Sequence, residues 1–389
     1  MIKLLQKATS IYHQKGYFLR WFDKRSLTLF LVFKKSIPRK KIKSNELPIL
    51  VICDLLLGDL AISGFFFMKL KEIYPERRVI LLCKKGLASA AKIFNFDTVV
   101  EIDYLSWKVL YKLKSLSPGG FSEVFDIFSS KWLLLLNGLS YENITSHSSI
   151  KKTFHQVIDS QVNLPNRPSQ AVEIVMSLLG RDAFNSFSHN KAQLNIPYSI
   201  FKFTKPYIII HIGASKPARL WPIDLFEKVL TLSAKQETQI LITGLRQQSD
   251  YENKINEIIQ ANNQTNKITN LMGKTTIQDL LSIVSRAKGL ISVDTSIVHW
   301  ARIFQTPNFS FLGQGDLNLF GGQFKYFKKS DSLGIQNLEC HDRKTFHGMQ
   351  LNWVSTCGYD QCPLAERHCF TKLDDQKIKL RLNSFLSCL

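Results

Sequence analysis

A loop between an apolar stretch and a helical one combines two cations with a small hydroxyl residue. It follows Tyr207–Ile210 and reads HIGASKPARLWP, with Gly213-Ala214-Ser215 ahead of Arg219. Backbone N–H groups, a hydroxyl and a planar, permanently charged guanidinium suit a phosphate or diphosphate. Alternatively, Lys216 and Arg219 are solvated surface cations. Trp221-Pro222 reads as structural, with the proline opening the next helix.

Two further loops place carboxylates at helix starts. Leu57-Gly58-Asp59 follows the apolar run Leu47–Cys53, where a glycine permits close approach and the helix N-terminus favours ionised Asp59. Asp294-Thr295-Ser296 ends a second such run and opens a helix that carries His299 one turn later. Its first N–H groups lack helical partners and can meet a ligand. Taken singly, each loop has an ordinary explanation: a helix-capping Asp and a buried core His.

The elements that must position these loops alternate between strand and helix. Continuous apolar runs predict buried parallel strands at 47–53, 79–83 and 98–102, and again at 207–212, 239–244, 289–294 and 308–313. The stretch 268–273 could be a short strand or a loop. Helical patterns at 86–94, 224–234, 249–260, 275–287 and 295–304 separate the strands. This alternation predicts an α/β protein with two doubly wound domains and a cleft between them. Ligands bind such sheets beyond the carboxyl ends of their strands.

The length of 389 residues also favours two domains. We expect a basic arm at 1–46, one Rossmann-like domain at 47–203, a second at 204–335, and a Cys-containing excursion with a final helix at 336–389. The sequence between 108 and 203 is less regular, although 124–128 and 132–136 could each be a strand or a helix.

The net charge of +20 is concentrated near the N-terminus, because residues 1–50 hold 12 Lys or Arg and two acidic residues. That distribution argues against a nucleic-acid-coating protein and for a local patch that meets an anionic surface or acceptor. The arm contains no signal-peptide pattern and no membrane-spanning run, so we expect seven reduced cysteines in the cytoplasm. It could be a packed amphipathic helix, or a peripheral membrane contact through Phe18 and Trp21, which we favour.

In this order and at these spacings, the loops resemble the glycosyltransferase family that contains the lipopolysaccharide ADP-heptose heptosyltransferases. The matching motifs are L-G-D at Leu57–Asp59, G-A-S with a later basic residue and W-P at Gly213–Pro222, and D-[ST]-x-x-x-H at Asp294–His299, followed by Thr306-Pro307. The resemblance covers roughly residues 47–313. It departs where the family has an arginine before L-G-D, which leaves Asp54 as a rival carboxylate.

The resemblance implies a GT-B fold, with two Rossmann-like domains facing a central cleft, and an inverting, metal-independent transfer from a nucleotide-sugar. The domain at 47–203 would bind the acceptor, and the domain at 204–335 would bind the nucleotide-sugar. By position, Asp59 would be the general base and Arg219 would neutralise the leaving diphosphate. The donor-binding residues would be Gly213, Ala214, Ser215, Lys274, Thr275, Thr276, Asp294, Thr295, Ser296 and His299. Within that set, Lys274–Thr276 would lie near the base and Asp294 would hold sugar hydroxyls. No metal and no cofactor beyond the co-substrate ADP-heptose would be required.

The acceptor implied is the anionic lipopolysaccharide or lipooligosaccharide inner core, met by a cytoplasmic enzyme peripheral to the inner membrane. Two alternatives remain: a protein O-heptosyltransferase of the autotransporter type, and a non-catalytic glycan-binding protein on the same fold. Cys340, Cys357, Cys362 and Cys369 raise a metal question, although their spacing is looser than that of a zinc ribbon. A bound metal would favour the protein acceptor and a membrane-seeking arm the lipid.

Overall fold

The computed structural model describes residues 23–29, 32, 46–128, 130–147, 158–180, 182–214, 216–245, 249–262, 267–322, 329–364 and 366–389. They form two compact units. Unit 1 comprises the described residues up to Leu56, with Leu70–Lys92 and Phe96–Asn163; unit 2 comprises Leu57–Lys69, Ile93–Asn95 and Leu164–Leu389. The boundary between the units therefore passes through helix α2 (Leu57–Ile73). The domain limits expected at 46, 203 and 335 stay predictions.

Unit 1 is built on a six-stranded parallel sheet with the order β3-β2-β1-β4-β5-β6. Its strands are β1 (Ile49–Cys53), β2 (Val79–Lys84), β3 (Thr98–Ile102), β4 (Phe121–Asp126), β5 (Tyr141–His147) and β6 (Ser160–Val162); its shorter helices are α3 (Ala88–Ala91) and α4 (Trp107–Leu116). Every residue of β1 is buried, as a strand covered on both faces requires. The three strands predicted in this half are confirmed.

One helical stretch of the N-terminal arm belongs to the core of unit 1. Residues 23–29 are helical, and the fully buried Leu27 packs in the same cluster as Leu50 and Leu110. The indole N–H of Trp107 donates to Ser26 Oγ at 3.0 Å. This part of the arm is therefore a packed helix, whereas Phe18 and Trp21, which we expected at a membrane, lie outside the described residues.

Unit 2 is built on a second six-stranded parallel sheet, with the order β12-β11-β10-β7-β8-β9. The strands are β7 (Tyr207–His211), β8 (Gln239–Thr243), β9 (Ile268–Asn270), β10 (Gly289–Val293), β11 (Asn308–Leu312) and β12 (Ser330–Gly334). The helices are α5 (Ala171–Met176), α6 (Ile223–Ala234), α7 (Ser249–Asn262), α8 (Ile277–Arg286), α9 (Ser296–Ile303), α10 (Leu317–Phe320), α11 (His368–Thr371) and α12 (Asp375–Ser387). The strands and helices predicted in this half are confirmed.

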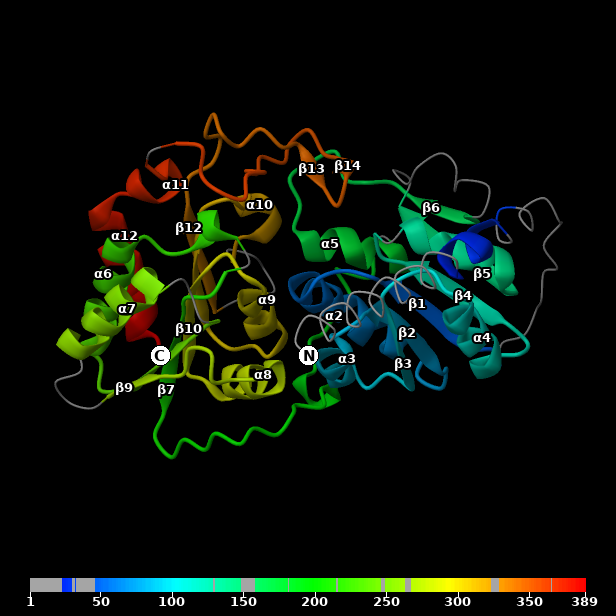
Figure 1. Cartoon of the computed structure of the whole chain (residues 1–389), viewed down its shortest axis with the longest axis horizontal. Helices are drawn as coiled ribbons and strands as arrows, with labels where there is room; N and C mark the ends of the chain where they lie inside the picture. The colour runs from blue at the N-terminus through cyan, green and yellow to red at the C-terminus, as the bar shows by residue number, and fades with distance from the viewer. Residues whose placement is uncertain are drawn as a thin grey trace, which may run out of the picture. The chain divides into compact units, whose positions relative to one another are not determined.

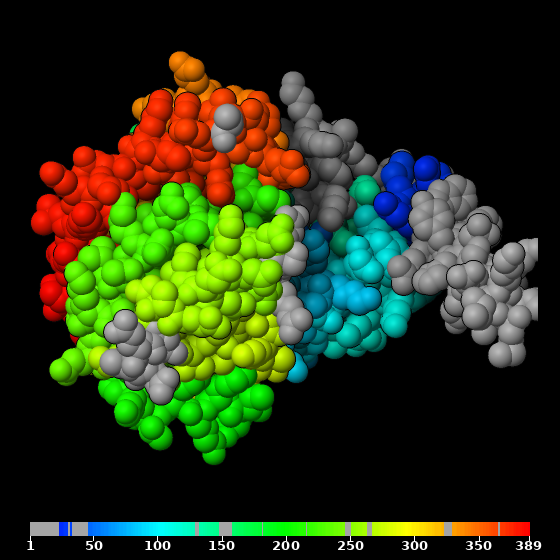
Figure 2. Space-filling model, turned by 60° about the vertical axis from the view of Figure 1, so that its left-hand side comes forward, coloured from blue at the N-terminus to red at the C-terminus, as the bar shows by residue number. Residues whose placement is uncertain are grey.

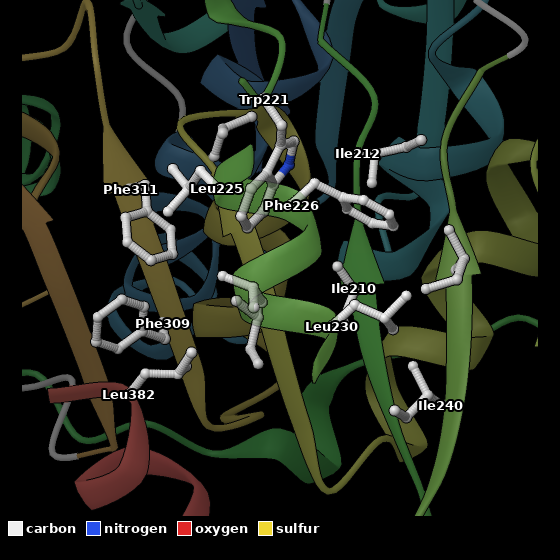
Figure 3. Close-up of a cluster of buried hydrophobic side chains, with 14 of the residues drawn as sticks. Ile210, Ile212, Trp221, Leu225, Phe226, Leu230, Ile240, Phe309, Phe311 and Leu382 are labelled. Carbon is white, nitrogen blue, oxygen red and sulfur yellow. The ribbon is translucent and has the colours of Figure 1, made fainter. Parts of the chain in front are cut away.

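Helices cover both faces of the second sheet (Figure 1), with α6, α7 and α12 on one face and α8 and α9 on the other. The core on the α6 face is centred on the fully buried Trp221, whose ring meets Phe311 edge-on at 5.4 Å (Figure 3). Pro222 is the N-cap of α6, so the structural role predicted for Trp221-Pro222 is confirmed. Helix α12 adds Leu382 and Phe385 to this core.

The residues between β12 and α12 form an excursion that contains a two-stranded antiparallel hairpin, β13 (Thr345–Phe346) and β14 (Met349–Gln350). In Figure 2 the excursion and α12, coloured orange to red, lie directly against the green residues of the same unit. No helix in the described part of the chain is long and apolar enough to span a membrane.

Candidate active site

The predicted donor segments meet at one edge of the second sheet. The chain runs from β7 outward through β8 and β9, then returns to the other side of β7 and continues through β10, β11 and β12. The sheet therefore reverses its order between β7 and β10, and in parallel sheets such a switch point is where ligands bind. Gly213 and Asp294 each lie two or fewer residues beyond these two adjacent strands.

The loop after β7 passes close to the loop after β8. A Cβ added at Gly213 would lie 3.1 Å from the Cα of Gly244 and 3.1 Å from His211 Nε2, so this approach leaves no room for a side chain. Ala214 packs against the core of unit 2. The hydroxyl of Ser215, which we predicted beside the diphosphate, lies outside the described residues.

Arg219 is held by the loop that follows β11. Its Nε donates to Gln314 Oε1 at 3.0 Å, and Gln314 Nε2 donates in turn to the carbonyl of Tyr359 at 2.6 Å. The adjacent backbone N–H of Ala218 donates to the carbonyl of Asp360 at 3.1 Å. The C-terminal excursion thus fixes the backbone and guanidinium of Arg219 together. A cation with a fixed fork can meet a diphosphate without first being ordered.

The start of α9 forms a polar, buried neighbourhood. Thr295 is the N-cap residue, and its hydroxyl lies 3.3 Å from that of Ser292. The Asp294 side chain is buried against Gly315, where an added Cβ would come within 2.4 Å of Asp294 Oδ2. Arg302 is also buried. Burial lowers its pKa and the Asp294 carboxylate partly opposes this, so that the pKa is about 10 and the side chain remains a cation at neutral pH.

His299 is a buried neutral imidazole and not an exposed cation. Its pKa is lowered to about 3, mainly by burial and also by the charges of Arg302 and Arg219, while the carboxylate of Asp59 opposes them. Its ring lies 5.8 Å from that of Phe320. The charges of Asp59 and Arg219 therefore both act on the same imidazole, which places the predicted base and the predicted cation in one neighbourhood.

The Leu57-Gly58-Asp59 turn packs on α9 within unit 2. The indole N–H of Trp300 donates to the Leu57 carbonyl at 3.2 Å. A Cβ at Gly58 would lie 3.3 Å from the Cα of Ser296 and 3.7 Å from His299 Cδ2. Two motifs more than 230 residues apart in sequence are therefore in direct contact.

The segment Lys274–Thr276 follows β9 at the same edge of the sheet. Gly273 N–H donates to the Gly244 carbonyl at 2.9 Å, which links it to the loop beside Gly213. Thr276 is the N-cap of α8: its hydroxyl accepts from the backbone N–H of Asp279. Lys274 Nζ donates to the carbonyl of Asn270 at 2.9 Å. In this structure both side chains thus have structural partners. Thr275 lies between them.

The rival carboxylate, Asp54, belongs to unit 1 and accepts a hydrogen bond from the indole N–H of Trp132 at 2.5 Å. Asp59 instead accepts one at Oδ1 from His347 Nε2, at 3.1 Å. The two carboxylates of this stretch therefore have different partners.

Four cysteines of the excursion lie within electrostatic reach of one another. The pKa of the Cys369 thiol is raised to about 12, mainly by burial and also by the thiols of Cys362, Cys340 and Cys357. All four are unbridged. Among the described residues, no group of three or more His, Cys, Asp or Glu side chains is arranged to hold a metal ion.

Three residues of this neighbourhood were missing from the sequence prediction: Gln314, Arg302 and His347. Gln314 stands in GQGD directly after the strand 308–312, and a glycine-flanked polar residue at a strand end was a usable signal. Arg302 lies one turn beyond His299 on α9, and a single arginine in a helix is no signal of a buried site. Nothing in the sequence linked His347 to Asp59, because the two are 288 residues apart.

Solved structures with the same architecture are heptosyltransferases. Escherichia coli ADP-heptose lipopolysaccharide heptosyltransferase II has a TM-score of 0.61 at 15% identity, with 88% of this chain and 99% of that chain covered. E. coli heptosyltransferase WaaC with ADP-2-deoxy-2-fluoro heptose gives 0.51 at 14%, over 74% and 92%. The dodecameric iron-containing heptosyltransferase TibC of E. coli, in complex with ADP-D-beta-D-heptose, gives 0.51 at 12%, over 89% and 78%. The fold is thus the α/β GT-B fold of nucleotide-sugar-dependent transferases.

A family model carries the identification further. The model of glycosyltransferase family 9 (heptosyltransferase) matches residues 148–346, just over half of the chain. A comparison with curated proteins found no match. The chain belongs to glycosyltransferase family 9 and is a glycosyltransferase that uses a nucleotide-sugar donor. This confirms the family, the fold class and the enzymatic nature expected from the loops.

Proposed function

We propose that this protein transfers a heptose from ADP-heptose to a hydroxyl group of the lipopolysaccharide inner core, with inversion at the anomeric carbon. The observation that carries the proposal is the contact between the Gly58-Asp59 turn and the first turn of α9, which brings the turn that contains Asp59 against Ser296 and His299. The charge of Arg219 also acts on the His299 imidazole. An acid–base group and a permanent cation in one neighbourhood are what such a transfer needs.

Asp59 is the general base in this mechanism. The acceptor oxygen forms a bond to the anomeric carbon of the donor as its proton passes to the Asp59 carboxylate. The bond from that carbon to the diphosphate oxygen breaks, and its electron pair leaves with ADP. The position of Asp59 in the first turn of α2 supports this role, because the N-terminal dipole keeps the carboxylate ionised and able to accept the proton.

Arg219 stabilises the charge that develops on the diphosphate. Gln314 fixes its fork before the donor arrives, and a preorganised cation contributes more than one that must be ordered during the reaction. The backbone N–H groups of Gly213 and Ala214, with those of Thr295 and Ser296 and the hydroxyl of Ser215, complete the diphosphate site. Asp294 accepts hydrogen bonds from the sugar hydroxyls, and Lys274–Thr276 lie along the nucleoside.

His299 has a different role in this mechanism from the direct donor-binding role that the family resemblance implied. As a buried neutral ring between Phe320 and the turn at Gly58, it shapes the floor of the donor site and transfers no proton at neutral pH. The described residues contain no group of His, Cys, Asp or Glu side chains that could hold the iron named for TibC.

The inner-core acceptor is favoured by the near-complete coverage of the lipopolysaccharide heptosyltransferase II structure and by the cationic first 50 residues. We place the enzyme in the cytoplasm, at the inner face of the inner membrane. The second candidate is O-heptosylation of a protein. The likeness to an iron-containing heptosyltransferase favours it.

The acceptor is tested by ADP release and product analysis with ADP-heptose and two sets of acceptors, truncated inner cores and unmodified autotransporter passenger protein. We expect turnover with a truncated core, and the product linkage should have the anomeric configuration opposite to that of the donor. Transfer to the protein alone would replace the lipid acceptor, and retention of configuration would overturn the single-displacement mechanism.

The base is tested by comparing two substitutions in one stretch. Asp59→Asn keeps size and hydrogen bonding but removes the base, so kcat should fall by about 10²–10⁴ while donor binding is retained. Asp54→Asn serves as the matched control, because its carboxylate has a partner in unit 1; kcat should stay within about threefold. The measurement is kcat with both substrates saturating. A dead Asp54→Asn enzyme beside an active Asp59→Asn enzyme would reverse the assignment.

A further inference from the structure

The hairpin β13–β14 presents one side chain from a strained position. Its strands are joined by two residues only, His347 and Gly348, with Phe346 opposite Met349. Both turn residues have positive φ, 49° and 78°, which is the geometry of a type I′ turn. Asn or Gly is preferred at the first of these positions, and a histidine there is unusual. Such strain is often found where a side chain has a task.

The hairpin is anchored so that the turn has a fixed place in unit 2. The buried Phe346 contacts Phe320 of α10 with ring centroids 6.0 Å apart, and Phe320 also contacts His299. Met349, on the opposite strand, is buried as well. The ring of His347 packs edge-on against that of Phe346 at 4.4 Å. The imidazole is therefore held on one side by the anchored Phe346 of its own hairpin.

The imidazole reaches the Asp59 carboxylate. His347 Nε2 lies 3.1 Å from Asp59 Oδ1, and each side chain is about 20% exposed. An ionised carboxylate can only accept hydrogen bonds, so the proton of this bond is on Nε2. We propose that His347 is a positioning residue: its Nε2–H fixes the plane of the Asp59 carboxylate and stabilises its ionised form, which keeps the base aimed at the acceptor hydroxyl.

This inference rests on the base role proposed for Asp59. The rate of the catalysed reaction falls steeply when a general base moves out of place, because the proton that it takes must be within hydrogen-bond reach in the transition state. Partners that orient a reacting group from behind typically contribute 10- to 100-fold. The donor site is formed by other loops, so the loss of His347 should lower kcat and leave the KM for the donor nearly unchanged.

Two substitutions separate a positioning role from a purely structural one. His347→Gly suits the positive φ and removes the N–H donor, so the hairpin should be as stable as in the wild type while kcat falls about 10- to 100-fold. His347→Gln restores an N–H at the distance of Nε2, and kcat should recover to within about fivefold of the wild type. Asn337→Gly is the control, since exposed Asn337 has a similar φ of 57° in the same excursion; its kcat should be unchanged.

The Asp59→Asn background distinguishes failure of this inference from failure of the proposed function. If His347 acts through Asp59, His347→Gly should slow the Asp59→Asn enzyme by less than about twofold. An equal loss in both backgrounds, or a His347→Gly enzyme with wild-type kcat and Tm, would overturn the positioning role. A fully active Asp59→Asn enzyme would instead overturn the proposed base, whatever the His347 variants do.

Discussion

At the scale of single residues, the side chain of Arg219 is fixed by a chain of hydrogen bonds. Its Nε is bonded to Gln314, which is itself bonded to the excursion, and its charge acts on His299 together with that of Asp59. The neighbouring cation, Lys216, has a different environment: its Nζ lies 2.7 Å from Asp360, whose side chain is 79% exposed. The two basic residues of one loop can therefore be told apart.

Replacing Arg219 by Ala should lower kcat by about 10²–10³, because the charge of the leaving diphosphate would develop without its main counter-ion. Lys216→Ala should change kcat by less than about threefold, since exposed ion pairs contribute little. Steady-state turnover at saturating donor is the measurement. Equal losses in the two variants would mean that the loop acts by its net charge and not through a positioned guanidinium.

At the scale of elements, the sequence predicted the parallel strands well and the excursion poorly. Runs such as YIIIH at 207–211 are buried throughout and apolar up to His211, and they admit few structures other than a covered strand. Strand β5 reads YENITSH and contains five polar residues besides its tyrosine. Strands β13 and β14 have two residues each. Such elements are stabilised by their tertiary neighbours, which local pattern does not reveal.

The candidate site shows the same division between residues with a local sequence pattern and residues that depend on tertiary neighbours. Loops at strand ends can be recognised in the sequence by their glycines and helix-capping residues. Asp59, Gly213, Arg219 and Asp294 could therefore be predicted as candidate site residues. Partners that arrive from elsewhere in the chain, such as Gln314 and His347, could not, because their significance depends on a fold that brings distant segments together. Thr276 shows the opposite limit: a good cap and a good ligand have the same sequence signature.

Thr276→Ala separates those two explanations. Loss of the N-cap bond to Asp279 should lower the free energy of unfolding by about 1 kcal/mol, and Thr276→Ser should restore it. Denaturant unfolding gives the stability, and initial rates over a range of donor concentrations give KM. If Thr276→Ala instead raised the donor KM tenfold with unchanged stability, the threonine would be a nucleoside ligand first.

At the scale of the whole molecule, two buried histidines make stability depend on pH. Burial lowers the pKa of His211 to about 4 and that of His299 to about 3. The unfolded chain, with ordinary values near 6.5, binds protons first as pH falls. The stability that these neutral rings allow is complete above pH 6.5 and is lost on acidification towards pH 4 and 3.

We therefore expect the free energy of unfolding to fall between pH 6 and pH 4.5, by up to about 1.4 kcal/mol per pH unit for each ring. His211→Gln keeps a donor for Thr243, the partner of His211 Nδ1, but cannot take up a proton, so its slope should be smaller by about that amount. Urea unfolding at several pH values gives both slopes. Parallel slopes would show that His211 does not titrate on unfolding.

The N-terminal arm also acts at this scale. Residues 1–22 carry four Lys or Arg and no acidic residue, and they precede the helix that contributes Leu27 to the core. Deleting residues 1–22 should reduce sedimentation with anionic vesicles several-fold without lowering Tm, and about 1 M salt should reduce wild-type sedimentation in the same way. Equal sedimentation of the two proteins would assign the charge to acceptor binding and not to the membrane.

Helix α12 has a consequence for how the protein is made. Its residues Leu382 and Phe385 complete the core on the α6 face of the second sheet, whose last strand, β12, ends at Gly334. While a ribosome is still adding the residues that follow that strand, the apolar face beside Phe309 stays uncovered. The second unit is thus prone to aggregation late in translation. A nascent chain stalled before residue 375 should bind chaperones that the released chain does not bind.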